Sequence, residues 1–512
     1  MDFALIVVAV LLFASVVGSL ASEKLGVPSL VLFLLIGILA GTEGIGHIRF
    51  DNAETAKEIG VIALSFIIFS GGFGTQFRMV KPVFGPGISL STLGVLLSCA
   101  LMGVFFHFAL GFPLATGFLI GAILSATDAA SVFSVLNSRD VVLKGNIKPL
   151  LEFESASNDP MSVALTVGII TLIQTPSGSG WDLVFFLVRQ FAIGGIAGFA
   201  IAWTAVYSLK RFIKLDYEGV YSALTIALVL FTYGISNVLG GSPFLAVYIL
   251  GIYMGNSDIL YKRNLLRYHD NLSWMAQVLM FLCLGLLILP SRIPQTALTG
   301  IFSTLFLIFV ARPVSVFASF LFFPKIGIRE KLLVSWIGLR GAAPIILSTF
   351  PLLAGISRAN DIFYIVFFTV IVSVLIQGTS IPAVAKLLGL YDKGRKNVKY
   401  PIELEKSDKL QGELNEIEVP ERAVIAGKAI RDLRLPENVL IILVYRNGLF
   451  HPANGKSIIF TGDRLLVLAP MFAFLQFSFQ VLETLPEEEI QPKSGPSETA
   501  DYRDEAVRHL RD

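Results

Sequence analysis

Charged residues, cysteine and histidine are scarce in this sequence of 512 residues. Asp, Glu, Lys and Arg together make up 15% of the chain, which contains two cysteines and five histidines. Cys99 and Cys283 both fall inside apolar runs, so they predict neither a disulfide framework nor a metal motif. The net charge of +2 gives no reason to expect a nucleic-acid partner.

Motifs of several protein classes are also missing. The sequence has no phosphate-binding glycine loop, no nucleophile elbow and no metal-ligand spacing, so we expect neither an enzyme nor a bound cofactor. It lacks a carbonyl filter such as Thr-Val-Gly-Tyr-Gly, which argues against a regulated potassium channel.

Apolar residues, by contrast, make up 54% of the chain, which is typical of membrane proteins. Runs long enough to cross a bilayer predict an all-α polytopic membrane protein with about thirteen transmembrane helices. These runs begin near Phe3, Ser29, Gly60, Gly87, Leu114, Leu150, Leu183, Gly219, Pro243, Leu272, Leu298, Leu332 and Asp361. The second and ninth runs are short, so twelve spans are the alternative.

Basic residues are unevenly divided between alternate loops of the predicted topology. Fifteen Lys and Arg residues fall on one side and four on the other. Because short cytoplasmic loops are enriched in Lys and Arg, thirteen spans predict an external N-terminus and a cytoplasmic C-terminus.

The composition changes sharply after the last apolar run, and four regions follow from it. Residues 1–390 form the predicted membrane domain, and residues 391–401 form a basic linker. Residues 402–485 are predicted to form a small cytoplasmic α/β domain. Residues 486–512 form an acidic tail rich in Pro, Ser and Glu, for which we expect disorder.

Strand signals in the C-terminal domain surround a tight turn. Val439–Tyr445 is a β-branched run, Asn447-Gly448 is a two-residue hairpin signal, and Arg464–Leu468 predicts a further strand. Because about 80 residues form only a marginal core by themselves, we expect dimerisation.

Four polar side chains stand together inside the apolar run 150–172, namely Glu154, Ser155, Asn158 and Asp159. A carboxylate at mid-bilayer costs about 2.5 to 3.5 kcal/mol on insertion scales, so two of them indicate a function. In a helix, these side chains form two neighbouring stripes on one face. Pro160 leaves a backbone carbonyl without its helical partner and is predicted to interrupt the helix. Such oxygen ligands suit a monovalent cation at Asp159.

Two further spans contain polar or helix-weakening clusters. The fifth span carries Ser125, Thr127, Asp128, Ser131 and Ser134, and the twelfth carries Gly338, Arg340, Gly341 and Pro344. Both patterns suit helices broken at mid-membrane, where the ends of the half-helices carry partial charge. Paired interruptions in the two halves of a bundle indicate the binding site of a secondary transporter.

Four motifs together resemble the cation:proton antiporter-1 family, the NhaP-type Na⁺(K⁺)/H⁺ antiporters. Three lie in the clusters above, namely Thr127-Asp128, Glu154-x-x-x-Asn158-Asp159 and Gly338-Leu339-Arg340-Gly341, and the fourth is Phe69-Ser70-Gly71-Gly72 in the third span. The resemblance covers residues 3–390. It implies thirteen spans, inverted repeats with two broken crossing helices, and a homodimer in the cytoplasmic (inner) membrane.

The resemblance also implies a role for each polar residue. Asp159 would bind a proton and a cation alternately, and Ser155, Thr127 and Asp128 would supply further cation ligands. Asn158, Glu154 and Arg340 would form a stabilising network. The related electrogenic antiporters have a second aspartate in place of Asn158, so electroneutral exchange is implied.

Structural interpretations remain open beside these functional ones. Glu154 and Arg340 are expected to form a buried ion pair rather than a transport ligand, because a lone buried charge is costly. Thr127 and Asp128 suit capping of a half-helix as well as they suit ligation. The alternative role for Asp159 is that of a buried acid that stays protonated and only packs against its neighbours. Arg312 is expected to bind a backbone carbonyl or a lipid.

The C-terminal domain resembles the TrkA-C (RCK C-terminal) regulatory domain over residues 402–485. This resemblance implies a small regulatory ligand and favours K⁺ over Na⁺, as in cell volume regulation antiporters. The expected function is therefore exchange of K⁺ for H⁺ in cation, pH and cell-volume homeostasis. The alternatives are Na⁺/H⁺ antiport, organic-solute transport and a regulated potassium channel.

Overall fold

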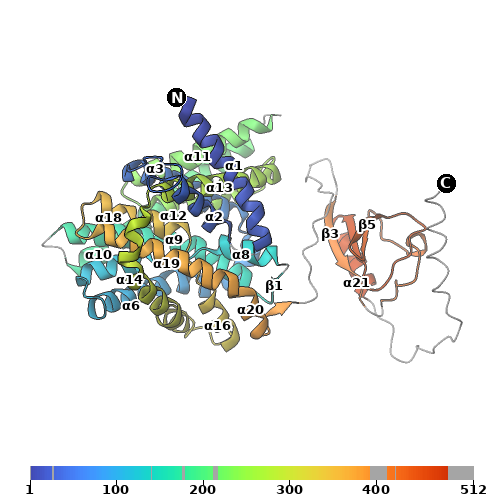
Figure 1. The fold of residues 1–512 in the computed structure, drawn as a ribbon. Helices are drawn as coiled ribbons and strands as arrows, with labels where there is room; N and C mark the ends of the chain where they lie inside the picture. Colours follow the sequence, from blue (N-terminus) through green and yellow to red (C-terminus); the bar gives the residue numbers. More distant parts are fainter. Residues whose placement is uncertain are drawn as a thin grey trace. The chain divides into compact units, whose positions relative to one another are not determined.

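The computed structural model describes residues 2–25, 28–139, 141–175, 179–211, 217–392, 412–420 and 423–482 (Figure 1). The chain divides into two compact units, Met1–Asn397 and Val398–Asp512. The expected linker beyond residue 392, the first ten residues of the expected C-terminal domain and the expected acidic tail lie outside the described residues.

The first unit is built of helices. Its N-terminal half contains α1 (Asp2–Leu25), α2 (Ser29–Ala40), α3 (Ala53–Gly74), α4 (Phe77–Val80), α5 (Phe84–Ser89), α6 (Val95–Phe108), α7 (Leu114–Ile123), α8 (Ala129–Ser138), α9 (Ile147–Gln174) and α10 (Gly180–Arg211). Its C-terminal half contains α11 (Glu218–Val238), α12 (Pro243–Gly255), α13 (Lys262–Leu286), α14 (Ile293–Phe306), α15 (Arg312–Ser319), α16 (Ile328–Trp336), α17 (Ala342–Leu347), α18 (Thr349–Leu353), α19 (Ala359–Ser373) and α20 (Thr379–Leu387). Strands β1 (Val142–Leu143) and β2 (Tyr391–Asp392) complete the unit.

Each predicted span coincides with a helix or with a series of helices in the unit. Within the described residues, seven helical segments are long and apolar enough to cross a membrane. Three of these join helices through π-helical turns at Leu90–Gly94, Leu307–Ala311 and Val374–Gly378. The short second and ninth runs are the shorter apolar helices Ser29–Ala40 and Pro243–Gly255.

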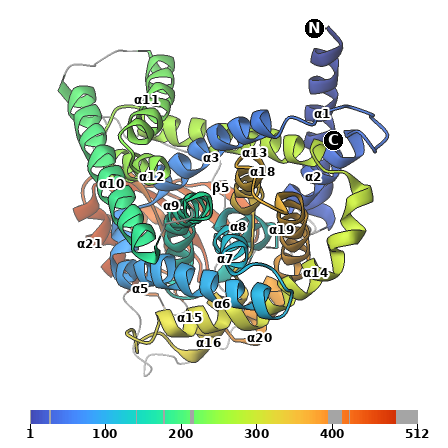
Figure 2. The same ribbon diagram turned by 90° about the vertical axis from the view of Figure 1, so that its left-hand side faces the viewer.

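Helices α7, α8 and α9 lie in the middle of the bundle. Figure 2 shows α10, α11 and α12 on one side of them and α14 and α19 on the other. The buried side chains form one continuous apolar cluster, to which α9 contributes Leu150, Leu151, Met161 and Leu165. The polar residues of α9 are therefore held inside a packed protein interior.

Two helices of the bundle are interrupted, as expected. One interruption separates α7 from α8 at residues 124–128, and the other separates α16 from α17 at residues 337–341. The two interruptions contact each other directly, because the backbone N–H of Asp128 donates to the carbonyl of Leu339 at 2.8 Å. Irregular backbone is tolerated at such depth only where other protein groups satisfy it.

The prediction that Pro160 and Pro344 interrupt helices is wrong. Pro160 lies inside α9, which continues through it from Ile147 to Gln174. Pro344 lies in the first turn of α17, where a backbone N–H has no partner within the helix and its loss costs little. Gly338 and Gly341, in contrast, lie in the interruption itself.

The second unit is a small α/β domain. Strands β3 (Glu413–Glu418), β4 (Leu440–Arg446), β5 (Leu449–Pro452) and β6 (Arg464–Ala469) form an antiparallel sheet in the order β3-β6-β4-β5. Helix α21 (Met471–Leu482) packs on it through the fully buried Phe477. The hairpin at Asn447-Gly448 is confirmed, with φ of 51° and 87° as a type I′ turn requires.

Candidate functional site

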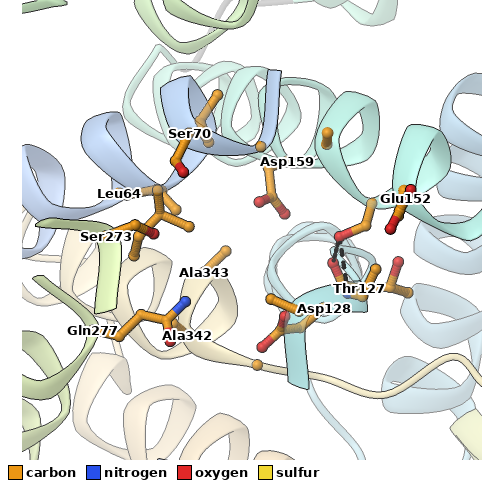
Figure 3. Close-up of a pocket in the computed structure, with 18 of the residues that line it drawn as sticks. Leu64, Ser70, Thr127, Asp128, Glu152, Asp159, Ser273, Gln277, Ala342 and Ala343 are labelled. Carbon is orange, nitrogen blue, oxygen red and sulfur yellow. Dashed lines mark hydrogen bonds between the residues drawn. The ribbon is translucent and has the colours of Figure 1, made fainter. Parts of the chain in front are cut away.

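A cavity of about 530 Å³ lies in the middle of the membrane unit, where the two helix interruptions meet α9. Its walls come from α3, α9, α13, the start of α8 and the start of α17. Figure 3 shows the carboxylate of Asp159 pointing into this cavity, with Asp128 and Thr127 on one side and Ser70 and Ser273 on the other. The cavity reaches the C-terminal end of α3 at Gly74 and Thr75.

Helix α9 holds the interruption between α7 and α8 through two side chains one turn apart. The Ser155 hydroxyl donates to the Thr127 carbonyl at 2.9 Å and accepts from the Ala129 N–H at 3.0 Å. The Asn158 amide donates to the Thr127 hydroxyl at 2.6 Å and accepts from its N–H at 3.4 Å. Asn158 is fully buried. Thus backbone groups that the interruption frees are satisfied by side chains of α9.

Asp128 caps the half-helix α8, as the structural interpretation expected. Its carboxylate accepts from the Ser131 N–H at 3.1 Å and from the Ser131 hydroxyl at 2.5 Å. Asp128 immediately precedes Ala129, the first residue of α8, so this is the N-cap arrangement. The carboxylate lies against Gly341 of the other interruption, where a Cβ atom would overlap it. Asp128 also lines the cavity, so capping and ligation are compatible.

Asp159 differs from its neighbours in its hydrogen bonding. Its Oδ1 atom is buried and has no hydrogen-bond partner among the described residues. A buried carboxylate oxygen without a partner is costly, and a proton or a cation would satisfy it. Ser155 and Asp128 line the same cavity as Asp159.

The prediction that Glu154 pairs with Arg340 is wrong, as is the expectation that Arg312 binds a carbonyl or a lipid. Glu154 forms a bidentate ion pair with Arg312, with Nη1–Oε1 and Nη2–Oε2 distances of 2.6 and 3.0 Å. Both residues are buried. Arg312 lies against Gly338, where a Cβ atom would come within 2.6 Å of its Nε. This ion pair therefore joins α9 to α15 beside the second interruption.

Arg340 instead stabilises the first interruption. Its Nη1 donates to the carbonyls of Ser125 and Ala126 at 2.7 and 2.8 Å. These carbonyls follow the C-terminal end of α7, which carries partial negative charge, so a fully buried cation is favourable there. Asn158, Glu154 and Arg340 thus all make stabilising contacts, but with partners other than each other.

Four cavity residues on α3 and α13 were not singled out from the sequence as site residues. The Ser70 hydroxyl donates to Asp270 Oδ1 at 2.7 Å, and Ser273 and Gln277 line the same wall. Ser70 belongs to Phe69-Ser70-Gly71-Gly72, one of the motifs that carry the family resemblance, but the resemblance implies no role for this motif. Asp270, Ser273 and Gln277 are spaced three and four residues apart, which places them on one helix face. That spacing, at the edge of the apolar run that begins near Leu272, is the signal that could have revealed them.

Two interrupted helices that meet at a central cavity with a carboxylate define a secondary active transporter. The comparisons with known proteins identify the family. The chain belongs to the sodium/hydrogen exchanger family, whose transmembrane domain matches residues 9–387, and a TrkA-C domain matches residues 414–472. This is a family of multi-pass cation/proton antiporters, which are transporters and not enzymes.

Several relatives are similar along most of their length. The chain is 35% identical to the K⁺/H⁺ antiporter NhaP of Alkalimonas amylolytica, over 92% of this chain and 82% of the relative. It is 36% identical to the K⁺/H⁺ antiporter NhaP2 of Shewanella oneidensis, over 90% of this chain and 80% of the relative. A solved structure of the sodium proton antiporter MjNhaP1 from Methanocaldococcus jannaschii is similar with a TM-score of 0.66 and 26% identity, over 76% of this chain and 100% of that chain.

Proposed function

We propose that this protein exchanges K⁺ for H⁺, one for one, across the cytoplasmic membrane, and that Asp159 binds the two ions alternately. The observation that carries the proposal is the buried, unpartnered Oδ1 of Asp159 facing a cavity between two interrupted helices. A proton on this carboxylate and a cation beside it exclude each other. Flux of one ion down its gradient then drives the other uphill, provided that the cavity opens to one side at a time.

The cation ligands proposed beside Asp159 are Ser155, Thr127 and Asp128. Two of these groups, the carbonyl of Thr127 and the carboxylate of Asp128, lie at the start of α8. The third, the hydroxyl of Ser155, lies on α9 one turn before Asp159 and contacts the same segment. Oxygen atoms of these three kinds can replace the hydration shell of K⁺ or Na⁺.

Electroneutral exchange is supported by the neutral side chain at Asn158. Its amide both donates to and accepts from Thr127, so it holds backbone and carries no titratable proton. Glu154 is paired with Arg312 and is not available to carry a second proton. Asp128 is held as the cap of α8 by its hydrogen bonds to Ser131, so Asp159 is the carboxylate proposed to exchange a proton in each transport cycle.

K⁺ is supported over Na⁺ by the relatives that match beyond the membrane unit. The relatives from Alkalimonas and Shewanella, which match 92% and 90% of this chain, are named K⁺/H⁺ antiporters. The relative from Methanocaldococcus jannaschii named Na⁺/H⁺ antiporter 1 matches 65% of the chain, at 31% identity. Na⁺/H⁺ exchange by the same mechanism is the second candidate, because the similar solved structure is that of a sodium proton antiporter.

The proposed setting is a homodimer in the inner membrane, with the N-terminus outside and the C-terminal domain in the cytoplasm. The uneven loop charge supports this orientation. The small core of the C-terminal domain supports dimerisation. A small regulatory ligand on that domain and a role in cation, pH and cell-volume homeostasis are part of the same proposal.

The test is dequenching of a pH-sensitive dye in proteoliposomes upon addition of K⁺ or Na⁺. We expect K⁺ to dequench the dye with the wild type and with the control Asp182→Asn, and not with Asp159→Asn. Asp182 is an exposed carboxylate at the start of α10, away from the cavity. A response to Na⁺ alone would favour the second candidate, and an unchanged Asp159→Asn variant would overturn the site.

A further inference from the structure

The connection between the two site-bearing helices α8 and α9 contains a short strand, β1. Its partner is β2, which follows α20 at the end of the membrane unit (Figure 1). The register places Val142 opposite Asp392 and Leu143 opposite Tyr391. Two further bonds extend the pair, from Lys144 N–H to the Leu390 carbonyl at 3.0 Å and from Lys144 Nζ to the Gly389 carbonyl at 3.2 Å.

The strand β1 is closely tied to both helices that form the cation site. On the α8 side, the Val141 N–H donates to the Leu136 carbonyl at 2.9 Å. On the α9 side, the helix begins at Ile147, and the Leu150 N–H donates to the Asn146 carbonyl at 3.1 Å. The intervening Leu143 is buried in the same apolar cluster as these helices. A displacement of β1 therefore reaches α8 and α9 over a few residues of the chain.

The strand β2 stands where the chain leaves the membrane unit for the C-terminal domain. Asp392 is the last described residue before that domain, whose TrkA-C match begins at residue 414. Along the chain, β2 is therefore the described element of the membrane unit that lies nearest to the C-terminal domain.

The strand pair is short enough to open. Each strand has two residues, and a cavity of about 360 Å³ lies beside it, lined by Arg139, Val141, Pro382, Lys386 and Tyr391. Few buried contacts and a small number of backbone bonds are the features of elements that open locally in native proteins. An element of this size can pass between a paired and an open arrangement.

We propose that the β1–β2 strand pair is the element through which the C-terminal domain controls the transport site, by holding or releasing the connection between α8 and α9. The paired arrangement favours the cavity seen in this structure, and release lets α8 and α9 move. This inference rests on the proposed function and specifies how the same site is regulated. Thermodynamic coupling requires that the state of the domain and the state of the strand pair shift each other equally.

The test uses the full chain with the substitutions Val142→Cys and Asp392→Cys. Residues that face each other in an antiparallel pair have Cα atoms about 4.5 to 5.5 Å apart, which a disulfide can bridge. Oxidation then locks the pair and reduction releases it in the same sample, which separates the effect from misfolding. The single Val142→Cys variant is the control for oxidation. Cys99 and Cys283 are buried and stay in place.

The domain is perturbed by Asp463→Asn, which weakens the bidentate contact of Asp463 with Arg446 at 2.7 and 2.8 Å. In reduced proteoliposomes, we expect this substitution to change K⁺-dependent proton flux by about fivefold or more. In the oxidised, locked protein we expect it to change nothing. An equal effect in both states, or no effect in the reduced state, would overturn the proposal, whereas slower exchange by the locked protein is expected because pairing restrains α8 and α9.

A second measurement needs no transport. The rate of disulfide formation between the two introduced cysteines reports how often the strands are paired, and Asp463→Asn should slow it by about fivefold or more. If Asp463→Asn left the rate of disulfide formation unchanged, the coupling between the domain and the strand pair would be contradicted, and the proposed function would not be affected. Absence of K⁺ or Na⁺ exchange in the wild type, with this rate still altered, would contradict the proposed function and leave the coupling standing.

Discussion

Glu154 of α9 and Arg312 at the start of α15 form a buried bidentate ion pair, with distances of 2.6 and 3.0 Å. Removing one partner leaves an uncompensated buried charge, which costs about 3 to 5 kcal/mol. We expect Arg312→Met to lower the thermal unfolding temperature strongly, and Glu154→Gln in the same chain to restore most of it. Fluorescence-detected unfolding in detergent measures both.

The same experiment separates the two arginines near Glu154. Arg340→Met should destabilise the protein without being rescued by Glu154→Gln, because Arg340 donates to the carbonyls of Ser125 and Ala126. Equal rescue of both arginine variants would show that Glu154 pairs with each of them.

Gly341 faces the carboxylate of Asp128 with no room for a side chain. We expect Gly341→Ala to cost about 1 to 3 kcal/mol of stability, because overpacking displaces neighbouring groups. K⁺/H⁺ exchange should fall by about tenfold or more, since Asp128 caps α8 at the site. Gly71→Ala and Gly74→Ala are matched controls in the same cavity, because a Cβ atom at either position meets nothing within 4 Å. If all three variants behave alike, close approach at Gly341 is unimportant.

Asn158 is expected to tolerate substitution by aspartate poorly. The amide donates to the Thr127 hydroxyl at 2.6 Å, and a carboxylate lacks this donor. We predict that Asn158→Asp lowers stability by about 1 to 3 kcal/mol. Unfolding in detergent is the measurement. A variant as stable as the wild type would contradict this prediction and show that the amide donor is not needed at residue 158.

Asp270, on α13, lines the same cavity as Asp159 and accepts a hydrogen bond from the Ser70 hydroxyl. A carboxylate in a cation pathway raises the local cation concentration, and salt screens this effect. We therefore expect Asp270→Asn to raise the K⁺ concentration for half-maximal exchange several-fold, with a smaller change in maximal rate. The difference should shrink as choline chloride is added.

The control for Asp270 is Asp258→Asn. Asp258 is an exposed aspartate shortly before α13 that does not line the cavity. A reduced maximal rate with unchanged half-saturation would indicate that Asp270 acts by positioning α13 against α3 rather than by attracting cations.

Glu43, in the loop between α2 and α3, accepts hydrogen bonds from the Ser291 hydroxyl at 2.6 Å and the Ser291 N–H at 2.8 Å. These bonds hold the pKa of Glu43 below its ordinary value. A group whose pKa is lower in the folded protein stabilises it fully above the unfolded pKa and loses that contribution as pH falls through the folded pKa. Wild type should therefore be more stable than Glu43→Gln near neutral pH, and the difference should shrink as the pH falls below the ordinary pKa range of glutamate. Unfolding temperatures across this range provide the measurement, and a difference independent of pH would contradict it.

Much of the fold could be predicted because the bilayer restricts what a chain can do. Apolar runs must be helical to satisfy their backbone groups, so the spans follow from their length. The turn at Asn447-Gly448 follows from the positive φ angles that these residues adopt easily. The interruptions follow from polar residues around Thr127 and from Gly338 and Gly341. Pro160 and Pro344 misled the same reasoning, because a proline within a helix or in its first turn can be accommodated by its neighbours.

The sequence by itself thus determined a helical membrane unit with a carboxylate at mid-span, two interrupted helices and a small C-terminal α/β domain. Only the tertiary structure decided which polar groups meet. Arg312 lies 158 residues from Glu154, Asp270 lies 200 residues from Ser70, and β2 lies far along the chain from β1. The periodicity of one helix defines which of its residues share a face, but the depth and rotation of that helix against its neighbours come from packing of the whole bundle. The pairing of charges across helices is therefore a property of the assembled bundle and not of any single span.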